Sequence, residues 1–173
     1  EKARGDGMDE EIYYDMIRDK TASLISAACA LGSITVTDNE EYSEALASFG
    51  ENLGMAYQIK DDLFEFVGRS SIIGKPIGKD VKANMLTLPL LHTMENLPKR
   101  EAKKMLRTMK RGAKTKQVRE IVKKVTNNGG LEYARKRLRH YSQEAINALD
   151  PFPDSRYKQA LIDFTTFNEI REK

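Results

Sequence analysis

The sequence predicts an all-α fold, a helical bundle, and three observations support that prediction. Apolar residues recur at steps of three and four along most of the chain, as they do on one face of an amphipathic helix. The alternation of apolar and polar residues that is typical of strands is scarce, and glycine and proline fall mostly between the periodic segments. With 173 residues, 40% of them hydrophobic and 32% charged, the chain is expected to form one globular domain rather than disordered polypeptide.

The first two helices are the longest that the pattern predicts. The first is expected from Asp9 to Leu31, and Gly32 is expected to end it, because glycine commonly follows the last helical residue. Asp38 or Asn39 would cap the next helix, since a short polar side chain there can accept from the free backbone N–H groups. The apolar pattern carries that second helix to about Val67.

Two glycines favour a central position for the second helix. Gly50 and Gly54 lie one turn apart, so both face the same side and permit a neighbouring helix to approach closely. A long helix that is largely apolar must also be covered on most sides. The sequence therefore predicts that this helix is the centre of the bundle.

Shorter elements are expected in the rest of the chain. Gly68 to Lys79 is predicted to be a loop, and a third helix should run from Asp80 to Met94, with Pro89 either bending it or marking its boundary. Further helices are expected over 98–111, 115–128 and 131–149, followed by a break at two prolines. A final helix, capped by Asp154, should then extend to about Arg171.

Basic residues are concentrated in one part of the chain. Between Lys99 and Lys124 the acidic residues are Glu101 and Glu120, while the basic residues are Lys99, Arg100, Lys103, Lys104, Arg107, Lys110, Arg111, Lys114, Lys116, Arg119, Lys123 and Lys124. Such a stripe can bind nucleic acid or a membrane surface. No aromatic residue interrupts it, as single-strand stacking would require. We expect a solvated helical face and no nucleic-acid partner.

Two absences indicate the compartment. No run approaches the roughly 20 apolar residues that a membrane span needs, so no stable membrane insertion is expected. The single cysteine, Cys29, rules out an internal disulfide framework, and its alanine neighbours suggest a buried, unreactive thiol. The sequence therefore predicts a cytoplasmic protein.

An acidic turn near the end of the second predicted helix could bind a metal ion. Asp61 and Glu65 are four residues apart and share a face, and Asp62 lies about 100° round from Asp61. Carboxylates this close repel one another, and a bound cation relieves that cost. Mg²⁺ prefers oxygen ligands and typically takes one or two carboxylates together with water and phosphate. A solvated acidic turn, or one paired with lysines, is the alternative.

Two further segments could bind phosphate. The loop Gly74–Asp80 combines glycines, which adopt backbone conformations that other residues resist, with the ammonium groups of Lys75 and Lys79. Lys20 and Thr21 lie just before the apolar part of the first predicted helix. An ordinary tight turn and a solvent-directed lysine, respectively, are the alternatives.

Taken together and in this order, these residues resemble the trans-type isoprenyl (polyprenyl) diphosphate synthases. The matching segments are Met16–Ile25, Phe49–Glu65, Gly74–Asp80, Thr87–Leu90 and Gly129–Ala134. The resemblance implies the all-α bundle of isoprenoid synthases and a Mg²⁺-dependent prenyltransferase. The implied reaction condenses isopentenyl diphosphate with an allylic diphosphate to give a longer polyprenyl diphosphate.

The resemblance also assigns roles to residues. It implies that Asp61, Asp62 and, with less support, Glu65 hold the metal ion. Lys20 and Lys75 would bind the allylic diphosphate, with Tyr57 and Gln58 as further contacts. Thr21 and Gln58 would line the site of the carbocation-like allyl group, so that Lys20, Thr21 and Gln58 serve the reaction itself.

This chain departs from the family pattern in several places. Glu65 stands where the family usually has aspartate, and Tyr57 where phenylalanine is common. Asn84 and Met85 stand where many members have glycine and lysine, which puts one phosphate contact in doubt.

The motifs that the family carries further upstream are absent, and the chain begins with Glu1. Residues 1–173 are therefore expected to be the C-terminal part of a single synthase domain that lacks its N-terminal helices, is not active alone and forms a homodimer. A non-catalytic helical subunit or interaction domain of a prenyl synthase complex is the alternative, and a terpene cyclase fits the loop less well.

Overall fold

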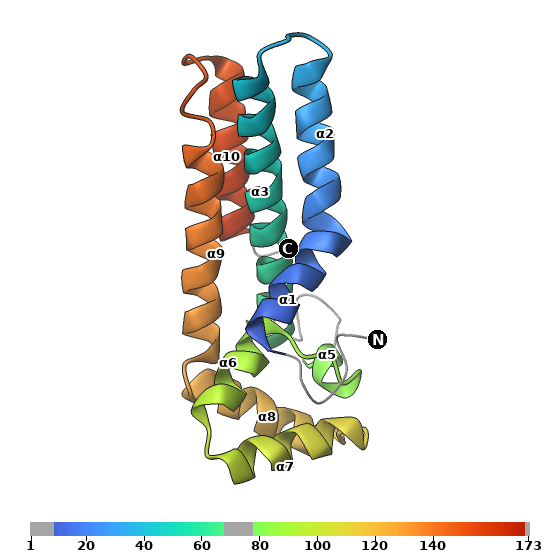
Figure 1. Ribbon diagram of the computed structural model, residues 1–173. Coiled ribbons are helices and arrows are strands. Elements are labelled where there is room, and N and C mark those ends of the chain that lie inside the picture. The colour runs from blue at the N-terminus through green and yellow to red at the C-terminus, as the bar shows by residue number, and fades with distance from the viewer. Residues whose placement is uncertain (1–8, 68–77, 172–173) are drawn as a thin grey trace. The chain divides into compact units, whose positions relative to one another are not determined.

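The computed structural model describes residues 9–67 and 78–171, and within these ranges it contains helices and no strand (Figure 1). The predicted all-α fold is therefore confirmed. The helices are, in chain order, α1 (Glu10–Ile17), η1 (Arg18–Ala22, a π-helical turn), α2 (Ser23–Ile34), α3 (Glu40–Val67), α5 (Lys79–Lys82), α6 (Leu88–Asn96), α7 (Lys99–Lys110), α8 (Thr115–Asn127), α9 (Gly130–Asn147) and α10 (Arg156–Ile170).

The chain divides into two compact units, and three of the helices contribute to both. Of the described residues, unit 1 contains 9–13, 61–67 and 78–135, and unit 2 contains 14–60 and 136–171. The divisions fall within α1, α3 and α9.

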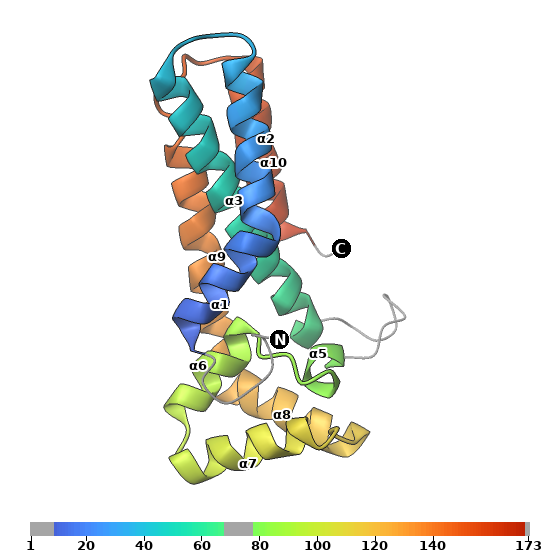
Figure 2. The ribbon, with the colours of Figure 1, turned by 45° about the vertical axis from the view of Figure 1, so that its right-hand side comes forward.

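Unit 2 is a bundle of long helices. In Figures 1 and 2, α2, the first part of α3, the second part of α9, and α10 run side by side. Its core contains Phe49 and Leu53 of α3, Ala145 of α9, and Leu149, all of them buried. Burying a side chain of the size of leucine or phenylalanine contributes about 1.5–3 kcal/mol, so these residues fix how α3 packs against α9.

The predicted close approach at Gly50 and Gly54 is confirmed. A Cβ atom on Gly54 would lie 2.5 Å from Cα of Ala22, and one on Gly50 would lie 2.8 Å from the carbonyl oxygen of Ile25. Real Cβ atoms essentially never come so near to backbone atoms. The two glycines therefore allow η1 and α2 to lie directly against α3.

Unit 1 contains the shorter helices. Leu88, Leu90 and Leu91 of α6 are buried, as are Met105 and Met109 of α7. The buried face of α8 consists of the side chains of Val118, Ile121 and Val125. Helices α7 and α8 lie side by side in Figures 1 and 2 and are joined by an ion pair between Glu101 and Lys124.

Two of the predicted helix boundaries are wrong. The first helix does not end at Gly32 but continues to Ile34, because nothing at Gly32 requires a turn. The helix predicted over Asp80 to Met94 is interrupted: α5 ends at Lys82, Asn84 has a positive φ of 55°, and α6 begins at Leu88. Pro89 marks a boundary, since it lies in the first turn of α6, where its missing N–H costs nothing.

The predicted N-cap is confirmed for α3 and is wrong by one residue for α10. Asn39 precedes α3, and its Oδ1 accepts a hydrogen bond of 3.0 Å from the N–H of Glu41. At α10 the cap is Ser155 rather than Asp154, because Oγ of Ser155 accepts from the N–H of Lys158 at 3.1 Å. The helices predicted over 98–111, 115–128 and 131–149 are confirmed to within two residues.

The structure bears on two further expectations, the absence of a membrane span and the burial of Cys29. Within the described ranges, no helix has both the length and the hydropathy that crossing a membrane requires. Cys29 is half-buried rather than fully buried, and it packs beside the unit 2 core. Even so, burial raises the pKa of its thiol, which agrees with the expected low reactivity.

Candidate functional site

The candidate residues fall into two groups, one in each unit. Lys20, Thr21, Tyr57 and Gln58 belong to unit 2. The acidic residues Asp61, Asp62 and Glu65 belong to unit 1 and follow on the same helix, α3. Lys75 and most of the glycine-rich loop lie outside the described residues.

In unit 2, Lys20 and Thr21 lie in the middle of the π-helical turn η1. The N–H of Ser23 reaches back five residues to the carbonyl of Arg18, which widens the turn relative to an α-helix. Such turns occur frequently at functional sites. The sequence pattern gave no sign of this turn, because a single wide turn leaves the apolar periodicity of the flanking helices in place.

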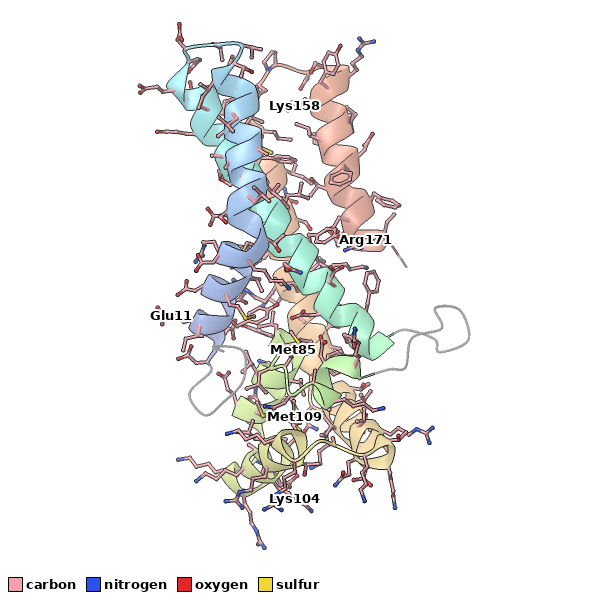
Figure 3. All side chains as sticks on the ribbon, turned by 90° about the vertical axis from the view of Figure 1, so that its right-hand side faces the viewer. Glu11, Met85, Lys104, Met109, Lys158 and Arg171 are labelled. Carbon is pink, nitrogen blue, oxygen red and sulfur yellow. The ribbon has the colours of Figure 1, made fainter. Side chains whose placement is uncertain are left out.

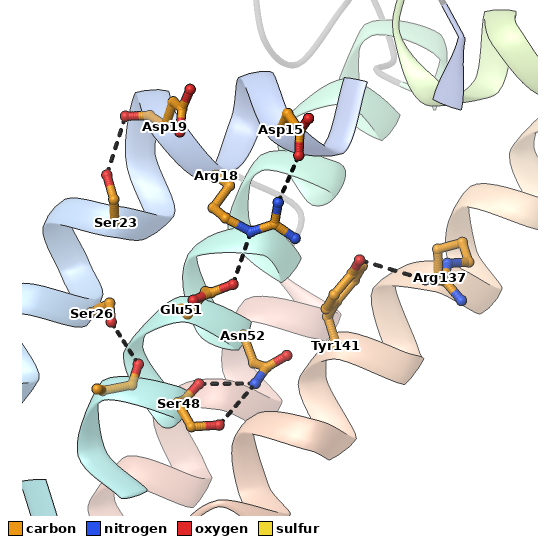
Figure 4. A network of polar contacts seen from close by, with 11 residues as sticks. Asp15, Arg18, Asp19, Ser23, Ser26, Ser48, Glu51, Asn52, Arg137 and Tyr141 are labelled. Carbon is orange, nitrogen blue, oxygen red and sulfur yellow. Dashed lines mark hydrogen bonds and ion pairs between the residues drawn. The ribbon is translucent and has the colours of Figure 1, made fainter. Parts of the chain in front are cut away.

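The π-helical turn is fixed to α3 by contacts along its length. At its start, Arg18 bridges two carboxylates, with Nε 2.9 Å from Glu51 and Nη1 2.8 Å from Asp15 (Figure 4). The hydrogen bond with Glu51 raises the pKa of Arg18. At its end, Ala22 packs against Gly54. These contacts set the position of Lys20 and Thr21 on the helix.

A hydrogen bond joins two of the predicted residues. Oγ1 of Thr21 donates to Oε1 of Gln58 over 2.8 Å, and the Gln58 side chain is only 8% exposed. A buried amide whose oxygen is already held has a fixed orientation, so its NH₂ group points in a defined direction. The structure thus brings together Thr21 and Gln58, which lie 37 positions apart.

Tyr57 and Lys60, which lie near Gln58 on α3, are less buried than Gln58 and contact the end of α10. Tyr57 is 39% exposed, and the guanidinium of Arg171 lies over its ring, 4.4 Å from the centroid. Lys60 donates from Nζ to the carbonyl oxygen of Glu169 at 2.7 Å. Both contacts hold the C-terminal end of α10 against α3, within unit 2. Lys20 is exposed.

In unit 1, the three acidic residues are half-buried, and the carboxylates of Asp62 and Glu65 accept hydrogen bonds. Oδ2 of Asp62 accepts from the hydroxyl of Tyr13 at 2.8 Å. Oε2 of Glu65 accepts from the N–H of Asp80 at 3.4 Å, and its carbonyl oxygen accepts from the N–H of Gly78 at 3.0 Å. Glu65 therefore joins the end of α3 to the start of α5.

Tyr13 could not be identified from the sequence pattern. Its ring is 1% exposed, yet its hydroxyl reaches a charged group 49 positions away. A tyrosine within an apolar periodicity is usually a core residue, and nothing in the local pattern distinguishes one that also orients a carboxylate.

The geometry limits what the acidic residues can do. Within the described ranges, no three His, Cys, Asp or Glu side chains are placed so that they could hold one metal ion. Carboxylate oxygens remain the ligands that Mg²⁺ prefers, and that ion usually takes only one or two of them. Asp61 and Asp62 fit such a site, in which phosphate and water would complete the coordination.

The loop that carries the unusual residues Asn84 and Met85 lies between α5 and α6. Asn84 has a left-handed backbone, with φ of 55°. Its Oδ1 and the Oγ1 of Thr87 are buried and have no hydrogen-bond partner among the residues that the structure describes. Met85 is half-buried and brings no charge to this loop.

Comparisons with known proteins agree on one family. The family model described as polyprenyl synthetase matches residues 1–125. The octaprenyl diphosphate synthase of Haemophilus influenzae is 33% identical over 153 residues, which are 88% of this chain and 46% of that protein. The all-trans-nonaprenyl-diphosphate synthase of Rhodobacter capsulatus is 33% identical over 90% of this chain and 47% of its own length.

Solved structures give the same result. The geranylgeranyl pyrophosphate synthetase of Pyrococcus horikoshii superimposes with a TM-score of 0.89 and 32% identity, over 99% of this chain and 51% of that one. A polyprenyl synthase of Caulobacter crescentus, in complex with calcium and isoprenyl diphosphate, gives 0.90 and 28%, over 99% of this chain and 53% of that one. The chain spans about half the length of the curated relatives it matches.

Proposed function

The chain belongs to the polyprenyl synthetase family, and we propose that it forms part of a prenyltransferase that condenses isopentenyl diphosphate with an allylic diphosphate. The observation that carries this proposal is the family match over residues 1–125, which includes every candidate residue. Residues 1–173 would then be the C-terminal part of one synthase domain, since the relatives are about twice as long.

In this proposal the reaction breaks the bond between the allylic carbon and the diphosphate oxygen. The double bond of isopentenyl diphosphate attacks the allylic carbon, a carbon–carbon bond forms, and a proton is lost. Negative charge develops on the departing diphosphate, so cations fixed near it stabilise the transition state. The bound Mg²⁺ would supply such charge.

Each candidate residue has a part in this chemistry. Asp61 and Asp62 would hold the Mg²⁺, and the hydrogen bond from Tyr13 orients Asp62 for that task. Glu65 would not share one ion with both aspartates, because no three such side chains among the described residues are placed to do so, and its carboxylate already accepts from a backbone N–H. The ammonium groups of Lys20 and Lys75 would bind the diphosphate.

The uncharged residues would act on the allyl group. The oxygen dipoles of Thr21 and Gln58 can stabilise positive charge that develops on carbon, and their mutual hydrogen bond fixes both side chains before substrate binds. Tyr57 would add a contact to the substrate, with its ring steadied by Arg171.

Exposed apolar side chains support a further part of the proposal. Leu24 and Leu31 of α2 are 74% and 60% exposed, and Phe164, Phe167 and Ile170 of α10 are exposed as well. Apolar surface of this kind usually marks a contact with another polypeptide. It is in keeping with the proposed homodimer and with a longer synthase domain whose other helices cover these faces. We propose that this synthase is cytoplasmic, as expected from the sequence.

Calorimetric titration of the chain with a non-reacting thiodiphosphate analogue of an allylic substrate, with and without Mg²⁺, tests the proposal. We expect binding that requires Mg²⁺ and is lost in Asp61→Asn. The matched control is Asp150→Asn, an exposed aspartate outside the candidate groups, which should bind as the unmodified chain does. Binding that ignores both Mg²⁺ and Asp61 would favour the non-catalytic helical subunit instead. If this chain does not bind, the same titration is repeated on a protein as long as the relatives, and absence of Mg²⁺-dependent binding there would favour the subunit.

A further inference from the structure

Helices α7 and α8 of unit 1 present a surface of one charge that the proposed reaction does not use. Residues 99–124 contain twelve Lys and Arg against Glu101 and Glu120. The net charge of the whole chain is only +3, so the remaining residues are net negative. The positive charge is therefore concentrated on this helix pair, named here the basic face.

On α7 the basic residues share one side of the helix. Lys99, Arg100, Lys103, Lys104, Arg107 and Lys110 fall within an arc of about 140° at 3.6 residues per turn. Met105 and Met109, which are buried, point the opposite way. Each of the six basic residues is exposed, and Lys104 is among the nitrogen-tipped side chains that extend outward in Figure 3.

On α8 the arrangement is the same. Lys116, Arg119 and Lys123 are exposed on the side opposite Val118 and Ile121, which are buried. The ion pair between Lys124 and Glu101 ties the two helices together, and Lys124 lowers the pKa of Glu101. One of the two acidic groups is thus already engaged by a lysine of the same surface.

We propose that the basic face binds an anionic membrane surface. An anionic membrane surface attracts each Lys or Arg near it by about 1 kcal/mol, or about fivefold in partitioning, and this attraction also offsets the repulsion between like charges held close on the two helices. The apolar sides of both helices are buried in unit 1, so the helices would lie on the headgroups and not insert.

Two observations favour a membrane over nucleic acid. Residues 99–124 contain no aromatic side chain on which the bases of a single strand could stack, which argues against single-stranded nucleic acid. In addition, and resting on the proposed function, the product of chain elongation is a lipid with a diphosphate head, which is poorly soluble in water. A synthase held at an anionic surface would release that product next to the membrane that takes it up.

Sedimentation of the full chain with lipid vesicles tests the proposal without any substrate, so its result does not depend on the proposed enzymatic function. We expect binding to phosphatidylcholine vesicles that contain phosphatidylglycerol, little binding to phosphatidylcholine alone, and release at high salt, because salt screens exposed charges. The double variant Lys103→Gln/Arg107→Gln should weaken partitioning about 25-fold, from two factors of about five.

The matched control removes the same two charge types elsewhere. Lys136→Gln/Arg156→Gln replaces an exposed lysine of α9 and an exposed arginine of α10, and should leave partitioning unchanged. Equal losses in both double variants, or equal binding to neutral vesicles, would overturn the proposal. So would tighter, salt-sensitive binding to duplex DNA than to the anionic vesicles, which would assign the basic face to nucleic acid.

Discussion

The hydroxyl of Tyr13 donates a hydrogen bond of 2.8 Å to Oδ2 of Asp62, across 49 positions of sequence. The tyrosine ring is buried and the carboxylate is half-buried, so water cannot easily replace this donor. A hydrogen bond to a charged group is worth more than one between neutral groups. The contact therefore both stabilises unit 1 and fixes a proposed metal ligand.

Replacing Tyr13 by phenylalanine should lower the free energy of unfolding by about 2 kcal/mol, since the hydroxyl bonded to a carboxylate is lost while the ring remains. Denaturant unfolding measures this. The control, Tyr157→Phe, changes an exposed hydroxyl of α10 and should shift stability by less than about 0.5 kcal/mol. On the proposed function, Tyr13→Phe should also weaken Mg²⁺-dependent binding of the diphosphate analogue; unaltered affinity would deny Tyr13 that orienting role.

Gly54→Ala should destabilise the chain by about 3 kcal/mol, because the new Cβ would lie 2.5 Å from Cα of Ala22 and force α3 away from η1. Gly32→Ala provides the opposite case. Gly32 lies within α2 with nothing within 4 Å of its added Cβ, so alanine should stabilise by about 1 kcal/mol. Thermal or urea unfolding measures the stability of both variants. Changes of the same sign in the free energy of unfolding would contradict the close packing at Gly54.

Asn84→Gly should raise the free energy of unfolding by about 1 kcal/mol, because glycine adopts a positive φ without a steric penalty. Asn84→Ala should lower it by about the same amount, since alanine has a Cβ and lacks the tolerance of asparagine for this conformation. Both changes remove the same buried amide, so the difference between them isolates the backbone. Identical stabilities would show that φ at this residue costs nothing.

Cys29 should react slowly with iodoacetamide at mildly alkaline pH in the folded chain and faster in urea. Burial raises the pKa of its thiol, so less of the reactive thiolate is present at a given pH. The same shift makes Cys29 favour folding fully below the pKa of the unfolded chain, and this contribution is lost as pH rises through the pKa of the folded one. Equal alkylation rates in both states would rule out protection by burial.

Most of the helices could be predicted because their signals are local. The helix over Thr115–Asn127 follows from apolar residues at steps of three and four, and Val118, Ile121 and Val125 are indeed its buried face. The length of α3 followed from the same periodicity and from Asn39 at its start. The wrong boundaries have two causes. Gly32 permits a turn without requiring one, and the positive φ of Asn84 interrupts a helix that the neighbouring residues would continue.

The candidate residues were found unequally well. The family resemblance pointed to Thr21 and Gln58, and the structure joins them by a hydrogen bond. Tyr13 and the π-helical turn were not foreseen, because a contact across 49 positions and one widened turn leave no mark on a helical pattern. The roles of Asp61, Asp62, Glu65, Lys20 and Lys75 stay predictions until ligand binding is measured.

The widened turn at Arg18–Ala22 has a consequence for insertions and deletions. A turn closed from residue i to i+5 holds one residue more than an α-helical turn. Homologues one residue shorter there could close an ordinary turn and leave both flanking helices in register. A deletion within α3 has no such reserve, because it would rotate every later residue by about 100° and carry Asp61 off its face. Gaps in alignments of this family should therefore occur at the turn that corresponds to Arg18–Ala22 and should not occur within α3.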